Sequence, residues 1–367
     1  MTTVSLCLIV RDEAHTLPTC LGSVRDLVDE CIVMDTGSTD ATAAVAREYG
    51  AAVYHTPWAD SFAAARSAAF QQATGDWIWW LDADDVLLPD DRERFRGLRH
   101  TLEGTDANRV SMRYHYAFDD AGQPILDFRV VRMVRRQAGW RWVGRVHEYL
   151  EAPDPEWASD VIVTHRRTHP AGERNLRIYD LMRQQGEPFT RRDQLYYANE
   201  LAQHGRPAEA VPLYRLVAGD PTVWVDDRFW ACLSLAEIDA ARGNRLESRR
   251  ALYDTFELGP PRAEVCCHLG YDAVEREAWA EARAWYAAAL ALERPHTPGF
   301  IREACWTWLP HLQLAVCYDH LGDVRRACWH NEQAARWHPE DPAVLHNRAY
   351  FRARGVVLAP PAPGTSG

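Results

Sequence analysis

Short apolar runs alternate with helical patterns along the first 85 residues. The apolar runs fall at residues 4–10, 30–34, 52–54 and 77–81, and the helical patterns between them fall at 16–28, 41–49 and 62–73. This alternation predicts strands joined by crossover helices, and therefore a mostly parallel sheet. The run Trp77–Leu81 is apolar at every position, as expected for a strand that is covered on both faces.

A different pattern follows. Three more strands are predicted at 109–116, 127–134 and 161–164, and from about Glu173 the chain reads as almost entirely helical. In this half a turn that leads into a helix recurs at Gly205, Gly243, Glu277 and Gly322, which are 38, 34 and 45 residues apart. A small residue and a larger one four positions later follow each turn, in the pairs Ala210/Tyr214, Ser248/Leu252, Ala282/Tyr286 and Ala327/Asn331. The repetition resembles tetratricopeptide repeats, whose ideal period is 34, with an inserted loop near residues 295–300.

These patterns divide the chain into an α/β domain at residues 1–185 and an all-α, tetratricopeptide-like helical repeat domain at residues 186–355. Stacked repeats of this kind form a solenoid with a concave binding face. Residues 356–367 are rich in proline, alanine and glycine and are predicted to be a disordered tail.

Charge, cysteine content and hydropathy exclude several classes of protein. The formal net charge of −11 argues against nucleic acid as a partner, because phosphate binding needs clustered Lys and Arg. The nine cysteines form no CxxC pair, which indicates buried free thiols and no zinc or disulfide framework. The chain has no apolar stretch of about 18 residues and no signal-peptide pattern, so we expect a cytoplasmic protein without a membrane span.

Acidic residues follow three of the first four strands. They are Asp12-Glu13, Asp35, and the group Asp82-Ala83-Asp84-Asp85. Ligands of open α/β sheets bind beyond the carboxyl ends of the strands. Two carboxylates two positions apart can hold a hard divalent cation, which would neutralise a diphosphate leaving group. The alternative is that this acidic group only caps the helix that follows Pro89.

Three segments together resemble the family 2 glycosyltransferases with the GT-A fold. They are Leu6–Glu13, Val33–Asp40 and Gly75–Asp85. The most similar subgroup joins this domain to tetratricopeptide-like helices and includes the S-glycosyltransferases that modify glycocin peptides such as sublancin. The resemblance covers about residues 4–180 well and the repeats more loosely. It implies an α/β GT-A fold and an inverting transfer from a nucleotide sugar, usually a UDP-sugar, with Mg²⁺ or Mn²⁺.

The resemblance also implies roles for individual residues. Asp35 would accept a hydrogen bond from the nucleotide base, Asp82 would contact the ribose or nucleotide, and Asp84 would bind the metal. The whole predicted donor-binding set is Val10, Arg11, Glu13, Asp35, Arg66, Asp82, Ala83 and Arg132. The alternatives are a turn-stabilising Asp35, a solvated Glu13 and a solvated Arg132. Two departures from the subgroup, Ser67 after Arg66 and Asp85 after Asp84, bear on donor preference more than on fold.

The segment Gly144–Glu148 resembles the subgroup's G-x-x-H-E motif on the acceptor side. An inverting transfer needs a base that takes the acceptor's proton. Glu148 is the candidate base and His147 its orienter or a neighbour of the metal, while a surface His–Glu pair is the alternative. Rival bases are Asp119, Asp120 and Asp127.

His165 ends the strand predicted at 161–164, where the subgroup has a histidine ahead of an Arg-Asn pair, here Arg174-Asn175. The resemblance implies that His165 is a further metal ligand, and a packed core histidine is the alternative. The spacing of His165 and His169 could also indicate zinc, but Pro170 and the strand context weaken that interpretation.

The sequence therefore predicts a metal-dependent sugar transferase acting on a peptide, natural product or glycan, with a repeat domain that binds the acceptor or forms a homodimer. A sugar nucleotidyltransferase would need a glycine-rich triphosphate loop, and Arg11–His15 contains no glycine. An adaptor protein with a relic transferase domain is the second alternative, and the intact Asp35, Asp82 and Asp84 argue against it.

Overall fold

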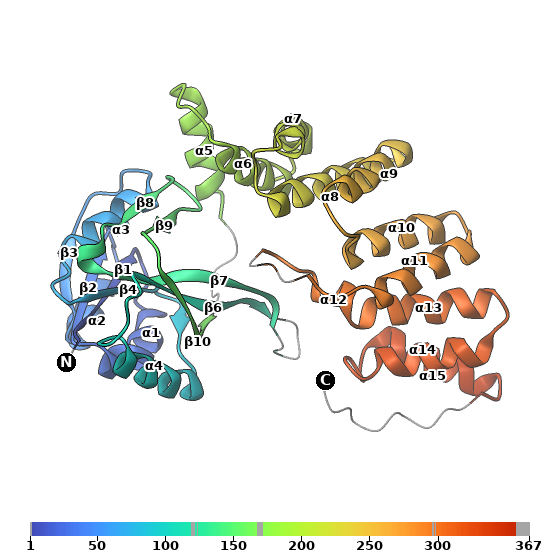
Figure 1. Ribbon diagram of the computed structural model, residues 1–367, viewed down its shortest axis with the longest axis horizontal. Helices are drawn as coiled ribbons and strands as arrows, with labels where there is room; N and C mark the ends of the chain where they lie inside the picture. The colour runs from blue at the N-terminus through green and yellow to red at the C-terminus, as the bar shows by residue number, and fades with distance from the viewer. Residues whose placement is uncertain are drawn as a thin grey trace. The chain divides into compact units, whose positions relative to one another are not determined.

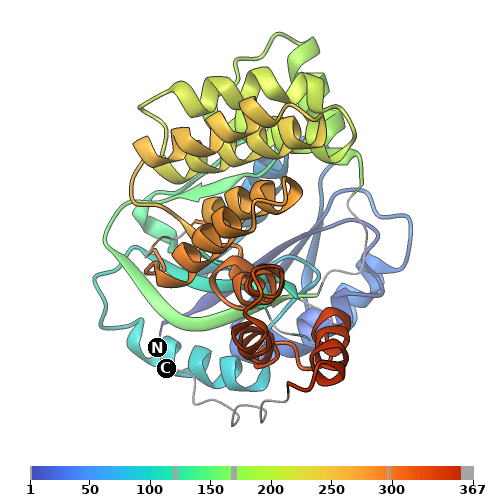
Figure 2. The ribbon, with the colours of Figure 1, turned by 90° about the vertical axis from the view of Figure 1, so that its right-hand side faces the viewer.

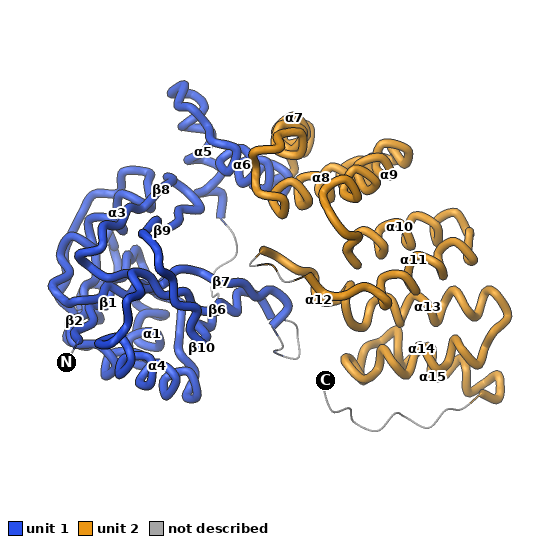
Figure 3. Tube along the Cα trace, viewed as in Figure 1, with its two compact units in different colours: residues 1–204 blue, residues 205–367 orange. Residues whose placement is uncertain are grey.

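The computed structural model describes residues 2–118, 122, 124–166, 172–295, 297 and 299–356. The chain divides into two compact units, residues 1–204 and residues 205–367 (Figure 3). Helix α6 thus belongs to the first unit, and the predicted domain boundary after residue 185 stays a prediction. The predicted tail lies outside the described residues, except for Val356.

The first unit is built on an eight-stranded sheet in the order β3-β2-β1-β4-β7-β6-β10-β5 (Figure 1). Its strands are β1 (Val4–Val10), β2 (Glu30–Asp35), β3 (Ala52–His55), β4 (Trp77–Trp80), β5 (Asp85–Val86), β6 (Arg109–Phe118), β7 (Pro124–Arg135) and β10 (Glu156–His165). Strands β8 (Arg141–Val143) and β9 (Tyr149–Glu151) form a separate antiparallel pair. The helices are α1 (Leu17–Val24), α2 (Thr42–Glu48), α3 (Phe62–Phe70), α4 (Pro89–Thr101), α5 (Arg174–Gln184) and α6 (Arg191–Gln203).

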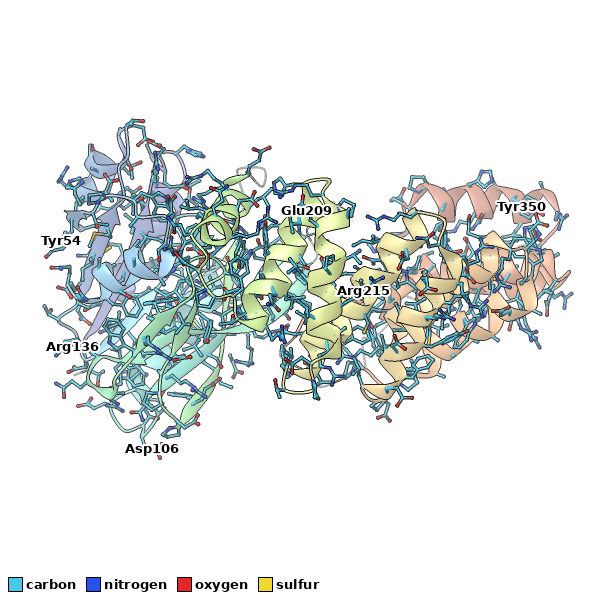
Figure 4. The ribbon with its side chains drawn as sticks, turned by 90° about the horizontal axis from the view of Figure 1, so that it is seen from above. Tyr54, Asp106, Arg136, Glu209, Arg215 and Tyr350 are labelled. Atoms are coloured by element: carbon cyan, nitrogen blue, oxygen red, sulfur yellow. The ribbon has the colours of Figure 1, made fainter. Side chains whose placement is uncertain are left out.

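The predicted α/β class with a mostly parallel sheet is confirmed. Strands β1, β2, β3 and β4 are joined by parallel pairings, and β6 pairs in parallel with β10. The antiparallel pairings involve β7, which runs between β4 and β6, and the short edge strand β5. Figure 4 labels Tyr54, an exposed side chain on the edge strand β3, and Arg136, just after β7.

Both faces of the sheet are covered, which explains the apolar strands. In β1, Leu6 and Leu8 face a core that includes Phe95 of α4 and buried residues of α1 and α2. Cys7 faces the opposite core, which is formed with α3, β8 and β9 (Figure 1). A strand between two such layers has no solvent side, so it carries no polar alternation.

The second unit is all helical, as predicted. Its helices are α7 (Pro207–Gly219), α8 (Val225–Ala241), α9 (Arg245–Asp254), α10 (Ala263–Glu275), α11 (Trp279–Ala291), α12 (Glu303–Trp306), α13 (Trp308–His320), α14 (Val324–Ala334) and α15 (Pro342–Ala353). Consecutive helices pack side by side (Figure 2). Figure 4 labels Glu209 and Arg215 on α7 and Tyr350 on α15.

The recurring turns have one backbone conformation. Gly205, Gly243 and Gly322 have φ values of 74°, 76° and 85°, and Glu277 takes the same left-handed conformation at φ 56°. The small and large residues that follow these turns are all buried. The repeat therefore has a physical basis: a left-handed turn begins each second helix, and a small residue lets that helix pack closely.

Two further expectations can be compared with the structure. All nine cysteines are buried and free, as predicted. Within the described ranges, each helix is too short or too polar to cross a bilayer.

Candidate active site at the carboxyl edge of the sheet

Three parallel strands bring their acidic ends to one edge of the sheet. The register of β1 aligns Val10 with Asp35 of β2 and Cys7 with Trp80 of β4. Asp12 and Glu13 follow β1, and Asp82 follows β4. Since carboxyl ends of parallel strands share an edge, the acids predicted from the sequence do lie on the side where α/β sheets bind ligands.

Asp35 is the buried last residue of β2, directly before a turn. Its Oδ1 accepts hydrogen bonds from the backbone N–H groups of Gly37 (2.9 Å) and Ser38 (2.8 Å). Its Oδ2 lies 3.5 Å from His55 Nδ1. The turn thus uses one oxygen of Asp35 and leaves the other beside His55. Contact of Asp35 with a nucleotide base stays a prediction.

Arg66 joins two acids that are distant in the sequence. Its Nη2 donates to Asp82 Oδ1 at 2.7 Å, and its Nε donates to Glu148 Oε1 at 2.6 Å. The guanidinium stacks against Trp80 (4.3 Å) and Trp142 (5.1 Å). Burial lowers the pKa of Arg66, but the two carboxylates more than compensate and raise it above its ordinary value.

Arg66 also fixes the charge of Asp82. Burial alone would raise the pKa of this carboxyl, but Arg66 and Arg132 bring the pKa below its ordinary value. Arg66 is carried by α3, which begins at Phe62; the hydroxyl of the preceding residue, Ser61, caps the helix by accepting from the N–H of Ala64. Asp82, Arg66 and Glu148 therefore form a continuous ion-paired chain, which we call the Arg66 chain.

Asp85 is fully buried beneath the edge of the sheet. Its Oδ1 accepts from the Tyr114 hydroxyl (2.8 Å), and its Oδ2 accepts from the N–H of Asp82 (3.0 Å) and lies 3.0 Å from Arg132 Nη1. Arg132 is 1% exposed and lies between the rings of Trp80 (3.9 Å) and Tyr114 (4.3 Å). Despite the ion pair, no guanidinium nitrogen of Arg132 has a well-aligned hydrogen bond to a described residue. The predicted contact of Arg132 with a diphosphate stays a prediction.

Asp84 and His165 face each other across β5 and β10. His165 Nδ1 lies 3.4 Å from Asp84 Oδ1 and 3.3 Å from Asp85 Oδ1, and the Tyr114 hydroxyl lies 3.0 Å from the same nitrogen. Within the described part of the chain, Asp84, Asp85 and His165 are the group of three such side chains whose ligand atoms gather within 4.8 Å. Oxygen ligands and an imidazole at this spacing fit a divalent cation.

The charges around Asp84 also fit a cation. The pKa of Asp84 is raised to about 7, chiefly by burial; His165 lowers it, and the nearby carboxylates of Asp82, Asp85 and Glu13 raise it. Burial lowers the pKa of His165, but the carboxylates of Asp85, Asp84 and Asp82 outweigh it and raise the pKa. Asp84 thus lies in an excess of negative charge that a cation would relieve.

His147 and Glu148 are consecutive but have different partners. Glu148 pairs with Arg66, whereas His147 Nε2 lies 3.0 Å from Glu200 Oε1 on α6, and its ring stacks on Tyr196 at 4.2 Å. His147 takes a left-handed backbone conformation (φ 49°), which is costly for a residue with a side chain. The structure thus brings Glu148 to the acidic cluster and anchors His147 to α6.

The remaining predicted donor residues line the end of β1. Val10 is buried, and its carbonyl accepts from the N–H and hydroxyl of Thr36. Arg11 is exposed, with Nε 3.9 Å from Asp12 Oδ2. Glu13 accepts from the Thr16 hydroxyl at 2.5 Å. Ala83 is buried between Asp82 and Asp84.

Of the rival bases, Asp127 forms an ion pair with Arg113. Asp119, Asp120 and His169 lie outside the described residues.

Sequence reasoning missed the residues that support the cluster. Tyr114 bonds Asp85 and lies beside His165, and Trp80 and Trp142 hold Arg66. Arg174 on α5 lies over the ring of Phe62 at 4.6 Å. Desolvation lowers the pKa of Arg174, while Glu148, Asp82 and Glu13 oppose that effect, so this cation faces the same acids. The one available signal was the position of Trp80 at the end of the apolar strand.

The fold and site define an α/β domain with an acidic, cation-compatible site at its carboxyl edge. Residues 5–116 of the first unit match the model of glycosyl transferase family 2.

Individual relatives are similar over part of the chain. A TPR repeat-containing protein of Synechococcus elongatus is 44% identical over 43% of this chain and 39% of its own length. The glycosyltransferase SunS of Bacillus subtilis is 28% identical over 40% of this chain and 34% of its own length. The chain thus matches well under half the length of each of these relatives. A solved structure of glucosyl-3-phosphoglycerate synthase from Mycobacterium tuberculosis with Mn²⁺ and UDP aligns over 52% of this chain and 82% of its own, at 19% identity and a TM-score of 0.36.

Proposed function

We propose that the protein is a metal-dependent, inverting glycosyltransferase that moves a sugar from a UDP-sugar to a peptide or small-molecule acceptor. The observation that carries the proposal is the meeting of Asp84 and His165 beside the Arg66 chain, in a unit whose residues 5–116 match the family 2 model. SunS, a relative over part of the chain, is named as a glycosyltransferase, which supports the same class of activity. We expect the second unit to bind the acceptor or to form a homodimer.

The donor would lie along the carboxyl ends of β1 and β2. Asp35 would receive the nucleotide base, Asp82 the ribose, and Arg11 and Glu13 would border the pocket. Asp84 and His165, with Asp85 within reach, would hold Mg²⁺ or Mn²⁺, which supplies positive charge to the departing diphosphate when bound.

Glu148 is the proposed base. As the acceptor atom bonds to the anomeric carbon, the bond from that carbon to the diphosphate oxygen breaks, and the acceptor's proton passes to the Glu148 carboxylate. The hydrogen bond from Arg66 Nε orients this carboxylate, and Asp82 on the other side of Arg66 ties it to the donor side. His147 would act as a positioning residue, because its contact with Glu200 holds the backbone that carries Glu148.

The test measures UDP release by the full chain from UDP-glucose, UDP-galactose and UDP-N-acetylglucosamine with Mn²⁺. We expect turnover with at least one donor, and a loss of about 100-fold or more in Asp84→Asn, as for loss of a group that stabilises charge in the transition state. Asp90→Asn is the matched control, since Asp90 is an exposed acid at the start of α4. It should keep wild-type turnover.

Binding separates the proposed roles. UDP with Mn²⁺ should raise the melting temperature by mass action in wild type and in Glu148→Gln, but not in Asp84→Asn. Glu148→Gln should therefore lose transfer and keep binding. Absence of both turnover and a UDP-dependent shift in the wild type would overturn the proposal and favour an adaptor with a relic domain.

A further inference from the structure

The second unit carries a polar stripe on two of its helices. On α8, Asp226, Trp230 and Glu237 are four and seven residues apart, so they lie on one side of the helix. On α10, Glu264 and His268 are four residues apart, and Arg262 directly precedes the helix. We call these six residues the α8–α10 stripe. Asp226 and Glu264 are nearly fully buried.

A segment of the chain itself, Gly299–Glu303, lies on this stripe. The Arg302 guanidinium forms an ion pair with Glu237, lies 3.3 Å from His268 Nε2, and covers the ring of Trp230 at 5.2 Å. The backbone N–H of Arg302 donates to Glu264 Oε1 at 3.0 Å. The stripe thus contacts Arg302 in three ways. Glu237 pairs with the guanidinium, the ring of Trp230 lies beneath it, and Glu264 accepts from the backbone N–H.

Gly299 lets the segment approach Asp226. A Cβ atom at this position would lie 2.4 Å from Asp226 Oδ2 and 3.0 Å from the ring of Trp224. The Thr297 hydroxyl and the Arg262 guanidinium both donate to the carboxylate of Asp226. Only a residue without a side chain fits at this point of contact.

The segment lies in the connection between α11 and α13 and includes the first residue of α12. Helix α11 packs directly on α13, and α10 packs on α11. The segment belongs to the insertion that lengthens one repeat spacing to 45 residues. Its end forms α12, which packs on α10 and α13.

The segment also leaves polar atoms of the stripe unsatisfied. Glu264 is 1% exposed, and its Oε2 has no hydrogen-bond partner among the described residues. A buried carboxylate oxygen without a donor costs about 1–3 kcal/mol. Arg262 Nη1 is also buried without a hydrogen-bond partner in the part of the chain that the structure describes. The segment therefore does not use the full hydrogen-bonding capacity of the stripe. A longer ligand could donate a hydrogen bond to Glu264 Oε2 and accept one from Arg262 Nη1.

We propose that the α8–α10 stripe is a binding surface for an extended, arginine-bearing peptide, and that Gly299–Glu303 occupies it in cis. The bound peptide would place its guanidinium on Glu237 and Trp230 and a backbone N–H on Glu264. The proposal concerns binding alone, so it does not depend on sugar transfer.

The test titrates a fluorescent peptide with the sequence of residues 299–305, with Cys305→Ser, against the full chain and follows anisotropy. Arg302→Ala should bind the peptide at least about tenfold more tightly than wild type. In wild type the segment competes in cis, so the apparent affinity falls in proportion to the fraction of molecules whose stripe is open. A peptide whose arginine is replaced by alanine should bind Arg302→Ala no more tightly than it binds wild type. Combining Arg302→Ala with Glu237→Gln should remove the gain.

Two further variants keep the test decisive. Gly299→Ala pushes the segment from Asp226 without changing the stripe, so it should also bind the peptide more tightly, even if Arg302→Ala fails to fold. Arg250→Ala on α9 removes one arginine that pairs with Glu247 at the surface and should match wild type. If neither Arg302→Ala nor Gly299→Ala binds more tightly than wild type, the segment is a fixed part of the unit and the proposal is wrong.

Discussion

The two units neutralise their acids in different ways. In the first unit, Asp84 is partly buried among other carboxylates, and burial above all raises its pKa to about 7, although the nearby imidazole of His165 lowers it. In the second unit, burial would raise the pKa of Glu237, but His268 and Arg302 outweigh it and bring the pKa to about 2. An acid whose charge the chain leaves uncompensated is suited to an external cation. An acid paired with an arginine is already satisfied.

The same contrast exists within the acidic group after β4. Asp82 pairs with Arg66, and Asp85 pairs with Arg132. Among these three carboxylates, Asp84 is the one without an arginine partner in the described residues. Asp82 and Asp85 therefore each pair with an arginine. Asp84, the acid that we propose as a metal ligand, has no arginine partner among the described residues.

Removing Arg132 should have the largest effect. Arg132→Met leaves Asp85 buried without its cation, and breaking such a pair costs about 3–5 kcal/mol. Arg302→Ala in the second unit should cost less, because Arg302 is 42% exposed and water can solvate Glu237. Denaturant unfolding of both variants compares the two effects.

A second substitution isolates the cause. Arg132→Met combined with Asp85→Asn should recover part of the lost stability, since it removes the unpaired charge. Equal losses in Arg132→Met and Arg302→Ala, or no recovery in the double variant, would contradict the comparison.

Asp84→Asn should separate stability from metal binding. Removing one of the crowded carboxylates reduces repulsion with Asp82, Asp85 and Glu13, so the metal-free melting temperature at pH 8 should rise. The same change removes a side chain that we propose as a metal ligand, so Mn²⁺ should no longer raise the melting temperature. Asp90→Asn should change neither quantity. A metal-free Asp84→Asn that melts below wild type would mean that Asp84 is a structural acid.

Local patterns predicted much of the first unit because its early strands and helices are encoded locally. The strand Val4–Val10 has the bounds expected from its apolar run, and Trp77–Trp80 is buried on both faces as its composition indicates. Strands β5, β8 and β9 were not predicted, since each has only two or three residues and exists through pairing with distant segments.

The acids at the strand ends could be predicted because strand direction places them at one edge. Their partners could not. Arg66 and Glu148 are 82 residues apart, and Tyr114 reaches Asp85 from a strand that is 29 residues away. Such contacts follow from tertiary packing, which no periodicity in the sequence records. The roles assigned to Glu148, His147 and His165 rested on resemblance, and they remain predictions about chemistry even where the side chains lie close together.

The ion pair of Glu237 should contribute stability that is lost at acid pH. Its pKa is depressed to about 2, so the stability it contributes is present above its ordinary value of 4.5 and is lost as the pH falls from 4.5 towards 2. The full shift would correspond to about 3 kcal/mol. Because the side chain is 36% exposed, solvent screening should reduce this to about 1–2 kcal/mol.

Unfolding midpoints at pH 5, 4 and 3 check this expectation. The difference in unfolding free energy between wild type and Glu237→Gln should shrink as the pH falls across that range, since the variant has no carboxyl to protonate. A constant difference between the two proteins at all three pH values would show that the ion pair does not stabilise the second unit.

The smallest effect is expected at the turn before α11. Gly205, Gly243 and Gly322 occupy the equivalent turns, whereas Glu277 holds a left-handed φ of 56° there. That conformation costs a residue with a Cβ about 1–2 kcal/mol. Glycine removes this strain but loses more freedom on folding, by about 0.5–1 kcal/mol, so Glu277→Gly should stabilise the protein by about 0.5–1 kcal/mol.

Glu275→Gly is the matched control for this change. Glu275 is also exposed, but it lies in the last turn of α10 with ordinary helical geometry, so glycine there should destabilise by about 0.5–1 kcal/mol. Opposite signs in the two thermal unfolding curves would show that the turn conformation, and not the loss of an acid, sets the effect. That result would also sharpen the comparison between the units, because it would place part of the second unit's stability in turns and arginine partners that the chain supplies itself. The same sign in both variants would mean that the left-handed turn at Glu277 carries no strain.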